Sequence, residues 1–203
     1  MTLTGPKKII VGITGATGSI LGVRVLQALQ SAGIERHLVL SKWGARTLIH
    51  ETPVTLEQVK NLATVTYNER DLGAAISSGS FVTDGMIVAP CSTRTLSAIA
   101  HGHGDNLIHR AADVILKERR PLVLVVRESP LSAIHLENML KLSRMGAVII
   151  PPMLAFYNHP RTINDMVDQA VMRVLDQLGI HLDLAQRWDG ALSADGAPVA
   201  EET

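Results

Sequence analysis

The sequence predicts an α/β fold: a single-domain, Rossmann-like (flavodoxin-like), doubly wound parallel sheet with helices on both faces. Two observations predict it. Short apolar runs recur without alternating polar residues, as in strands that are buried on both faces, and a helical pattern separates each run from the next. The predicted strands are residues 9–13, 37–40, 86–89, 122–126 and 148–150.

A glycine-rich turn follows the first predicted strand. Residues 12–18 read GITGATG, and Leu21, Val25 and Leu29 behind them mark one face of a helix. N–H groups at the start of a helix lack partners and the helix dipole favours an anion there, while glycine lets a ligand approach the backbone closely. The turn therefore predicts a ligand that contains phosphate.

The other strands also end in polar segments. Ligands of a doubly wound sheet bind beyond the carboxyl ends of its strands. The segments at those ends are rich in hydroxyl groups, basic groups or proline and comprise residues 41–43, 90–95, 127–130 and 151–160. The last helix, residues 163–178, is expected to start after a Thr162 cap and to stop at Gly179.

Composition limits the size and the partners of the protein. With 203 residues, of which 46% are hydrophobic and 19% charged, residues 1–190 are expected to form one domain around one core. Residues 191–203 contain almost no large apolar side chains and are expected to be a flexible tail. Nineteen basic and nineteen acidic residues exclude the broad positive field of a nucleic-acid-binding protein.

The sequence also limits the cellular location and the metal chemistry of the protein. The apolar stretch near the N-terminus is interrupted after about five residues, so neither a signal peptide nor a membrane span is expected. Cys91 is the single cysteine, which excludes an intramolecular disulfide and favours a cytoplasmic location. It is expected to be a small buried residue. The histidine spacings match no standard zinc pattern, so no metal site is expected.

Two kinds of nucleotide suit the glycine turn. A short-chain dehydrogenase needs an acidic residue after its second strand, where this chain has Ser41, and a tyrosine followed four residues later by lysine, which the chain lacks. Ser41 and the cluster of Ser92, Thr93, Arg94 and Thr95 suit a mononucleotide better. Ser92 also fits a plain helix N-cap, so both interpretations of this residue stay open.

Nine motifs occur in order between residues 8 and 190: GITGATG (12–18), SK (41–42), SGS (78–80), PCS (90–92), RAAD (110–113), LKERR (116–120), RE (127–128), HLENM (135–139) and AFY (155–157). In this combination the chain resembles the UbiX-type flavin prenyltransferases. The resemblance implies an enzyme that joins the dimethylallyl group of dimethylallyl phosphate to N5 and C6 of reduced FMN without a metal ion. Its product, prenylated FMN, would serve a separate UbiD-type decarboxylase, and the enzyme would form a homo-oligomer, expected to be a dodecamer with active sites at subunit contacts.

The same resemblance assigns roles to individual residues. It implies that FMN is held by Gly15, Ala16, Thr17, Ser41, Ser92, Thr93, Arg94, Thr95 and Arg127. It implies that the donor phosphate is bound by Lys117, Tyr157 and Arg173, and that Glu51, Glu128 and Lys117 are catalytic. Lysine, arginine and tyrosine side chains can stabilise the charge of a departing phosphate. Glu128 is the expected proton-transfer group near N5.

Other interpretations stay open. A flavin-dependent cysteine decarboxylase of the same fold is one, although residues 90–95 lack the asparagine-bearing segment of those enzymes, and a non-catalytic FMN carrier is another. Among single residues, Arg173 also fits a solvated helix position and Lys117 a charged helix end. Tyr157 also fits a packed loop aromatic.

Overall fold

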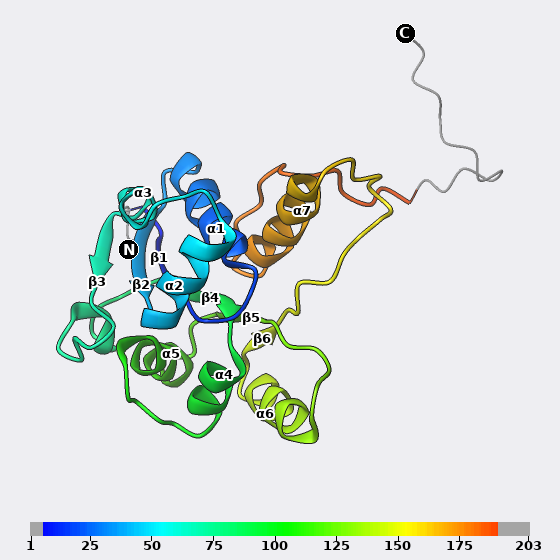
Figure 1. The fold of residues 1–203 in the computed structure, drawn as a ribbon. Coiled ribbons are helices and arrows are strands. Elements are labelled where there is room, and N and C mark those ends of the chain that lie inside the picture. Colours follow the sequence, from blue (N-terminus) through cyan, green and yellow to red (C-terminus); the bar gives the residue numbers. More distant parts are fainter. Residues whose placement is uncertain (1–5, 191–203) are drawn as a thin grey trace, which may run out of the picture.

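A computed structural model describes residues 6–190 and contains a six-stranded parallel sheet in the order β3-β2-β1-β4-β5-β6 (Figure 1). The strands are β1 (Lys8–Ile13), β2 (Glu35–Leu40), β3 (Val65–Tyr67), β4 (Gly85–Cys91), β5 (Leu122–Val126) and β6 (Val148–Ile149). All strands end at one edge, here named the carboxyl edge, and begin at the opposite amino edge. The predicted tail, residues 191–203, lies outside the described residues.

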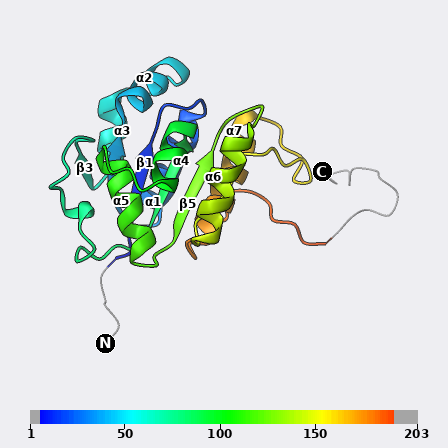
Figure 2. The same cartoon turned by 90° about the horizontal axis from the view of Figure 1, so that it is seen from below.

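Helices cover both faces of the sheet (Figures 1 and 2). One face carries α1 (Ser19–Ser31), α2 (Lys42–Glu51), α3 (Leu56–Leu62) and α7 (Ile163–Asp176). The other face carries α4 (Thr93–Ala100), α5 (Leu107–Lys117) and α6 (Ala133–Arg144), with a short 3-10 helix, η1 (Ala75–Ser77), before β4. The predicted doubly wound α/β fold is confirmed. None of the helices in residues 6–190 is long and apolar enough to cross a membrane.

Strand β1 explains why the strands appear as unbroken apolar runs. Ile9, Val11 and Ile13 belong to the core shared with α1 and α7, whereas Ile10 belongs to the core shared with α4 and α5. All four side chains are at most 1% exposed. Because helices cover both faces, no position along the strand favours a polar side chain.

Most of the predicted boundaries are confirmed. Thr162 caps α7 by accepting a hydrogen bond from the N–H of Asp165 at 3.2 Å, and Gly179 has the positive φ of 64° that is common where a helix stops. The regular helix ends at Asp176 rather than at residue 178. The sequence pattern misses β3, because this three-residue strand is short and lies largely exposed at the end of the sheet.

Candidate functional site

The carboxyl edge has a topological switch point between β1 and β4, because the chain first continues from β1 to β2 and later returns to the other side of β1. Thr14, buried directly after β1, ties the two strand ends together. Its hydroxyl donates to the carbonyl of Pro90 at 2.8 Å and accepts from the N–H of Ser92 at 2.8 Å. These bonds fix the glycine turn against the start of α4.

The glycine turn lies directly against α2. A Cβ on Gly15 would lie 2.4 Å from the Cβ of Trp43, so only glycine allows this approach. Ala16 is partly buried and Thr17 is exposed, and both lie between the end of β1 and the start of α1. The turn is therefore held from two sides, by α2 and by the end of β4.

A side-chain carboxylate occupies the start of α1. Glu51, the last residue of α2, accepts hydrogen bonds from the N–H groups of Gly18 at 2.9 Å and Ser19 at 3.0 Å. Burial acts to raise the pKa of Glu51, but the hydrogen bonds from Thr17, Ser19 and Gly18 outweigh it and lower the pKa. The glycine-rich sequence predicts a phosphate at these N–H groups. In the structure they bind Glu51 instead, because α2 folds back against α1.

Helix α2 starts beside the glycine turn. Ser41 caps this helix by accepting from the N–H of Gly44 at 3.0 Å, and the Glu69 carboxylate accepts from the N–H of Lys42 at 3.0 Å. A Cβ on Gly44 would lie 2.4 Å from the carbonyl oxygen of Ile13, so the helix packs closely on the end of β1. Ser41 therefore lies at the carboxyl edge with its hydroxyl engaged as a cap.

Helix α4 starts at the end of β4 with a group of hydroxyls. Ser92 accepts from the N–H of Thr95 at 3.3 Å, and its hydroxyl donates to the Thr95 hydroxyl at 3.1 Å. Ser92 is thus the N-cap of α4. The N–H groups of Thr93 and Arg94 lie in the first turn, where a helix supplies no internal partner. They can bind an anion while Ser92 keeps its capping role.

Arg127 and Glu128 follow β5 at the same edge. The N–H of Arg127 donates to the carbonyl of Cys91 at 3.2 Å, and the Glu128 carboxylate accepts from the N–H of Ser129 at 3.0 Å. Both side chains are exposed. The carboxyl edge thus brings together all the segments predicted to bind FMN, with Glu51 and Glu128 among them.

Lys117 lies at the amino edge, far from these segments. It is the last residue of α5, which runs back from the carboxyl edge over roughly 16 Å at about 1.5 Å per residue. Its ammonium group pairs with Glu118 and lies close to Gly79, where an added Cβ would be 2.8 Å from Nζ. Within one chain, Lys117 does not reach Glu51 or Glu128.

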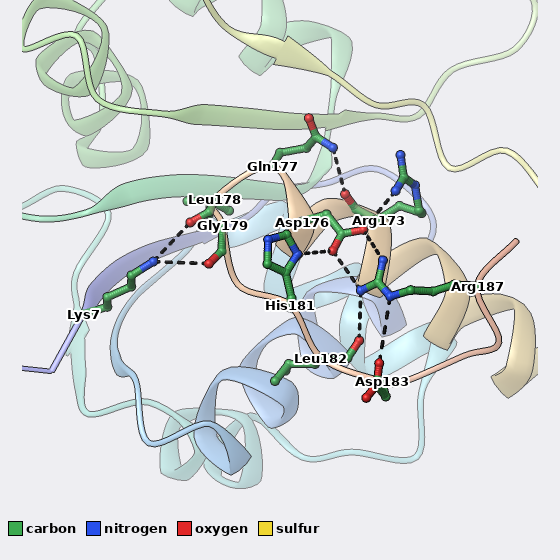
Figure 3. Close-up of polar contacts among 10 residues, drawn as sticks. All are labelled: Lys7, Arg173, Asp176, Gln177, Leu178, Gly179, His181, Leu182, Asp183 and Arg187. Atoms are coloured by element: carbon green, nitrogen blue, oxygen red, sulfur yellow. Dashed lines mark hydrogen bonds and ion pairs between the residues drawn. The ribbon is translucent and has the colours of Figure 1, made fainter. Parts of the chain in front are cut away.

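Tyr157 and Arg173 lie near each other beside α7. The Tyr157 hydroxyl accepts from Nε2 of Gln169 at 3.3 Å, and Arg173 follows one helical turn later. Nη1 of Arg173 donates to Oδ2 of Asp176 at 2.9 Å (Figure 3). Since α5 and α7 cover opposite faces of the sheet, a single chain does not bring this pair together with Lys117.

Sequence reasoning missed three residues that organise the site, namely Thr14, Glu69 and Asp176. Thr14 is identified only by its burial in the structure, where it is 2% exposed. Glu69 joins the starts of two helices, because its carboxylate binds the N–H of Lys42 and its carbonyl accepts from the N–H of Leu107 at 2.7 Å. Asp176 could have been noticed in the sequence, because it is an acidic residue at a helix C-terminus, where the helix dipole disfavours negative charge.

Cys91 takes no part in chemistry at this edge. Its side chain is fully buried, and burial raises the pKa of the thiol to about 12. Across residues 6–190, no three His, Cys, Asp or Glu side chains gather into a group that could hold a metal ion. The described site therefore offers hydroxyls, backbone N–H groups, carboxylates and basic side chains as its reactive groups.

Comparison with known proteins gives concordant matches. Residues 2–175 match the family described as Flavoprotein. A probable UbiX-like flavin prenyltransferase of Bacillus subtilis is 60% identical over 92% of this chain and 91% of its own length. The crystal structure of AnUbiX (PadA1) in complex with FMN and dimethylallyl pyrophosphate is 50% identical, with a TM-score of 0.91 over 93% of this chain and 100% of that chain. A dodecameric FMN-dependent UbiX-like decarboxylase from Escherichia coli O157:H7 is 58% identical, with a TM-score of 0.88 over 90% of this chain and 100% of that chain.

Proposed function

This chain belongs to the Flavoprotein family and, within it, to the UbiX-like flavin prenyltransferases, and from this membership we propose how its residues share the reaction. The protein is a flavin prenyltransferase that joins the dimethylallyl group of dimethylallyl phosphate to reduced FMN. The observation that carries this function is the 60% identity over 92% of the chain to a flavin prenyltransferase relative. Reduced FMN supplies the nucleophilic N5 atom when it is bound.

The carboxyl edge has the donors that the FMN phosphate and ribityl chain require. The hydroxyls of Ser41, Ser92 and Thr95 lie at the starts of α2 and α4. The N–H groups of Thr93 and Arg94 have no partner within their helix. Because the Glu51 and Glu69 carboxylates already bind the starts of α1 and α2, we place the phosphate at the start of α4.

The remaining FMN contacts follow from this placement. Gly15, Ala16 and Thr17 border the flavin from the β1 side, and Gly15 keeps that side free of a Cβ. Arg127 approaches from the end of β5 and, with Arg94, supplies positive charge opposite the flavin phosphate. The donor set is thus that of a mononucleotide site, as the sequence predicted.

Departure of the donor phosphate needs cations and a hydroxyl rather than a metal ion. We assign this role to Lys117, Arg173 and Tyr157, whose side chains are all at least partly exposed. A guanidinium and an ammonium neutralise the negative charge that develops on the leaving group, and the phenol donates a hydrogen bond to it. Each group acts on the same oxygens, so their effects on turnover are expected to be coupled.

These three residues reach the flavin from neighbouring subunits in our proposal, because one chain holds Lys117 at the amino edge and the other two beside α7, on the opposite face of the sheet from α5. Large apolar side chains support self-association, since a monomer would leave them in water. Eight of them, each at least 51% exposed, lie between the start of α6 and the first residue of α7: Ile134, Leu136, Leu140, Met145, Met153, Leu154, Phe156 and Ile163. We propose a homododecamer, the assembly of the Escherichia coli O157:H7 relative.

The two glutamates differ in what they are free to do. The hydrogen bonds of Glu51 at the start of α1 outweigh its burial and lower its pKa, so its proposed role is to fix the glycine turn. Glu128 is exposed and is the second residue after β5, so it can exchange a proton beside the flavin ring. Glu128 is therefore the proposed proton-transfer residue near N5 of the flavin.

The product requires a consumer, and we propose a UbiD-type decarboxylase in the cytoplasm that takes prenylated FMN. The proposal rests on the family and on the neutral overall charge balance, which gives no reason for a nucleic-acid or membrane partner.

Anaerobic incubation with reduced FMN and dimethylallyl phosphate, followed by mass spectrometry of the extracted flavin, tests the function. One added five-carbon unit is expected, and it should be lost in Glu128→Gln and retained in the exposed control Glu57→Gln. Parallel reactions with dimethylallyl pyrophosphate identify the preferred donor. Bound but unmodified FMN would contradict the transferase and favour a flavin carrier.

A further inference from the structure

We infer that Asp176 is a positioning residue whose carboxylate holds the guanidinium of Arg173 ready for the phosphate of the dimethylallyl donor. The C-terminal strap, defined as residues 181–188, holds Asp176 in turn. The inference rests on the proposed phosphate-binding role of Arg173 and adds to it the group that orients this side chain.

The Asp176 carboxylate is the centre of a network of basic groups (Figure 3). Arg187 donates to it through both terminal nitrogens, Nη1 to Oδ2 and Nη2 to Oδ1, each at 2.9 Å. Nδ1 of His181 lies 2.8 Å from Oδ1, and Nη1 of Arg173 lies 2.9 Å from Oδ2. Only 7% of the Asp176 side chain is exposed, so its carboxylate is surrounded by these protein groups rather than by water.

An acidic side chain is unfavourable at this position for two reasons. Asp176 is the last residue of α7, where the helix dipole opposes a negative charge, and its burial removes the carboxylate from water. Two guanidinium groups offset both effects. A locally unfavourable residue that is so fully compensated is typical of a functional site rather than of a plain helix end.

The charges in this network leave binding capacity on Arg173. The buried Asp176 carboxylate faces two permanent cations, and the exposed Asp183 carboxylate pairs with Arg187 rather than with Arg173. Arg173 contacts Asp176 through Nη1, and among the described residues its Nε and Nη2 make no hydrogen bond. Its side chain is 52% exposed. A guanidinium held at one nitrogen on a half-exposed side chain keeps the paired donors that a phosphate requires.

The C-terminal strap also holds the second proposed phosphate ligand. The ring of Trp188, next to Arg187, meets the ring of Tyr157 edge to face, with centroids 5.7 Å apart and planes at 81°. Gln169 of α7 donates to the Tyr157 hydroxyl. The strap therefore fixes Tyr157 by ring contact and Arg173 through Asp176.

The test compares Michaelis constants for the two substrates in Asp176→Asn, Arg187→Lys and the control Asp183→Asn. Asp183 is a fully exposed carboxylate of the strap, 3.9 Å from Nε of Arg187 and without contact to Arg173. We expect the first two variants to raise the KM for dimethylallyl phosphate about tenfold while the KM for FMN changes less than about twofold. The control should match the unaltered protein.

A double variant separates positioning from a general structural role. If Asp176 acts through Arg173, Asp176→Asn adds no further increase in KM once Arg173→Ala is present. Full additivity, or an unchanged KM in both Asp176→Asn and Arg187→Lys, would overturn the inference. Calorimetric binding of inorganic phosphate decides the question without turnover: Asp176→Asn should weaken phosphate binding about tenfold and Asp183→Asn should not. A failure of the unaltered protein to prenylate FMN would instead refute the proposed function.

Discussion

The carboxylate of Glu51 accepts a hydrogen bond of 2.9 Å from the N–H of Gly18, and this contact gives α1 the cap that its own N-terminal residue cannot supply. Gly18 adopts a positive φ of 96° and has no side chain with which to cap the helix. The end of α2 therefore completes the start of α1. The anion at the glycine turn therefore belongs to the protein, and our proposal places the anion of the ligand at the start of α4.

Replacing Glu51 with glutamine tests this contact. Glutamine keeps the size but loses the charge that interacts with the N–H groups of Gly18 and Ser19, so the free energy of unfolding should fall by about 1 kcal/mol. Prenyl transfer should fall with it. Urea denaturation measures the first effect, with Glu57→Gln as the exposed control. Equal stability of the two variants would show that the contact contributes nothing.

Gly22→Ala should destabilise the fold. A Cβ at this position would lie 2.3 Å from the carbonyl oxygen of Ala89 and 2.8 Å from Cγ1 of Ile13, so α1 would have to move away from β4. The clash should outweigh the roughly 1 kcal/mol by which alanine favours a helix, for a net loss of about 2 kcal/mol.

Gly104→Ala is the matched control for that variant. Nothing lies within 4 Å of the added Cβ at Gly104, so its unfolding free energy should stay within about 0.5 kcal/mol of the original. Chemical denaturation of both variants side by side makes the comparison. A Gly22→Ala protein as stable as Gly104→Ala would contradict the close packing of α1 on β4.

Cys91 should resist alkylation in the native protein. Burial raises the pKa of its thiol to about 12, and the side chain is 0% exposed. Iodoacetamide at pH 8 should therefore label it only after unfolding. Mass spectrometry of native and urea-treated samples reads out the label, and rapid labelling of the folded protein would show that the end of β4 opens.

Asp176 should make stability depend on pH in the acid range. Hydrogen bonds from Arg187, as the largest cause, lower its pKa from the usual 3.8 to about 2, against the opposing effect of burial. A lowered pKa stabilises the fold fully above the usual value, and this contribution of about 2 kcal/mol is lost as the pH falls through about 2.

Unfolding free energies measured between pH 2 and pH 5 check this expectation. Asp176→Asn should be less stable near pH 5 and should lose less stability on acidification than the unaltered protein. Parallel pH profiles of the two proteins would show that Asp176 is not the group that titrates.

Complementation tests whether active sites form between subunits. Lys117→Ala and Glu128→Gln should each be inactive alone, because each lacks one proposed group. If the two groups of one site come from different chains, co-expression of both variants restores on the order of a quarter of the sites by random assembly. Prenylated FMN per subunit, measured by mass spectrometry, gives the recovered fraction. No recovery would place both residues in the same chain's site.

Local patterns in the sequence predicted much of the fold and the general location of the site. The predicted features are local: the apolar runs around Ile10 and Leu124, the glycine turn and the Thr162 cap. Each depends on residues only a few positions away, so unbroken apolar runs and helix-capping chemistry were sufficient to predict them. The convergence of Ser41, Ser92 and Arg127 followed from parallel strands that end at one edge.

The sequence by itself therefore determined the parallel α/β fold, the polar loops at its carboxyl edge and the family to which the chain belongs. The tertiary structure alone decided that Glu51 caps α1, that Lys117 lies at the amino edge and that Asp176 binds Arg187. Glu51 lies 33 residues after Gly18, and Arg187 lies 11 residues after Asp176 in a segment without helix or strand, so no local periodicity encodes these contacts. They depend on how helices pack across the sheet, which sets the direction and reach of each long side chain.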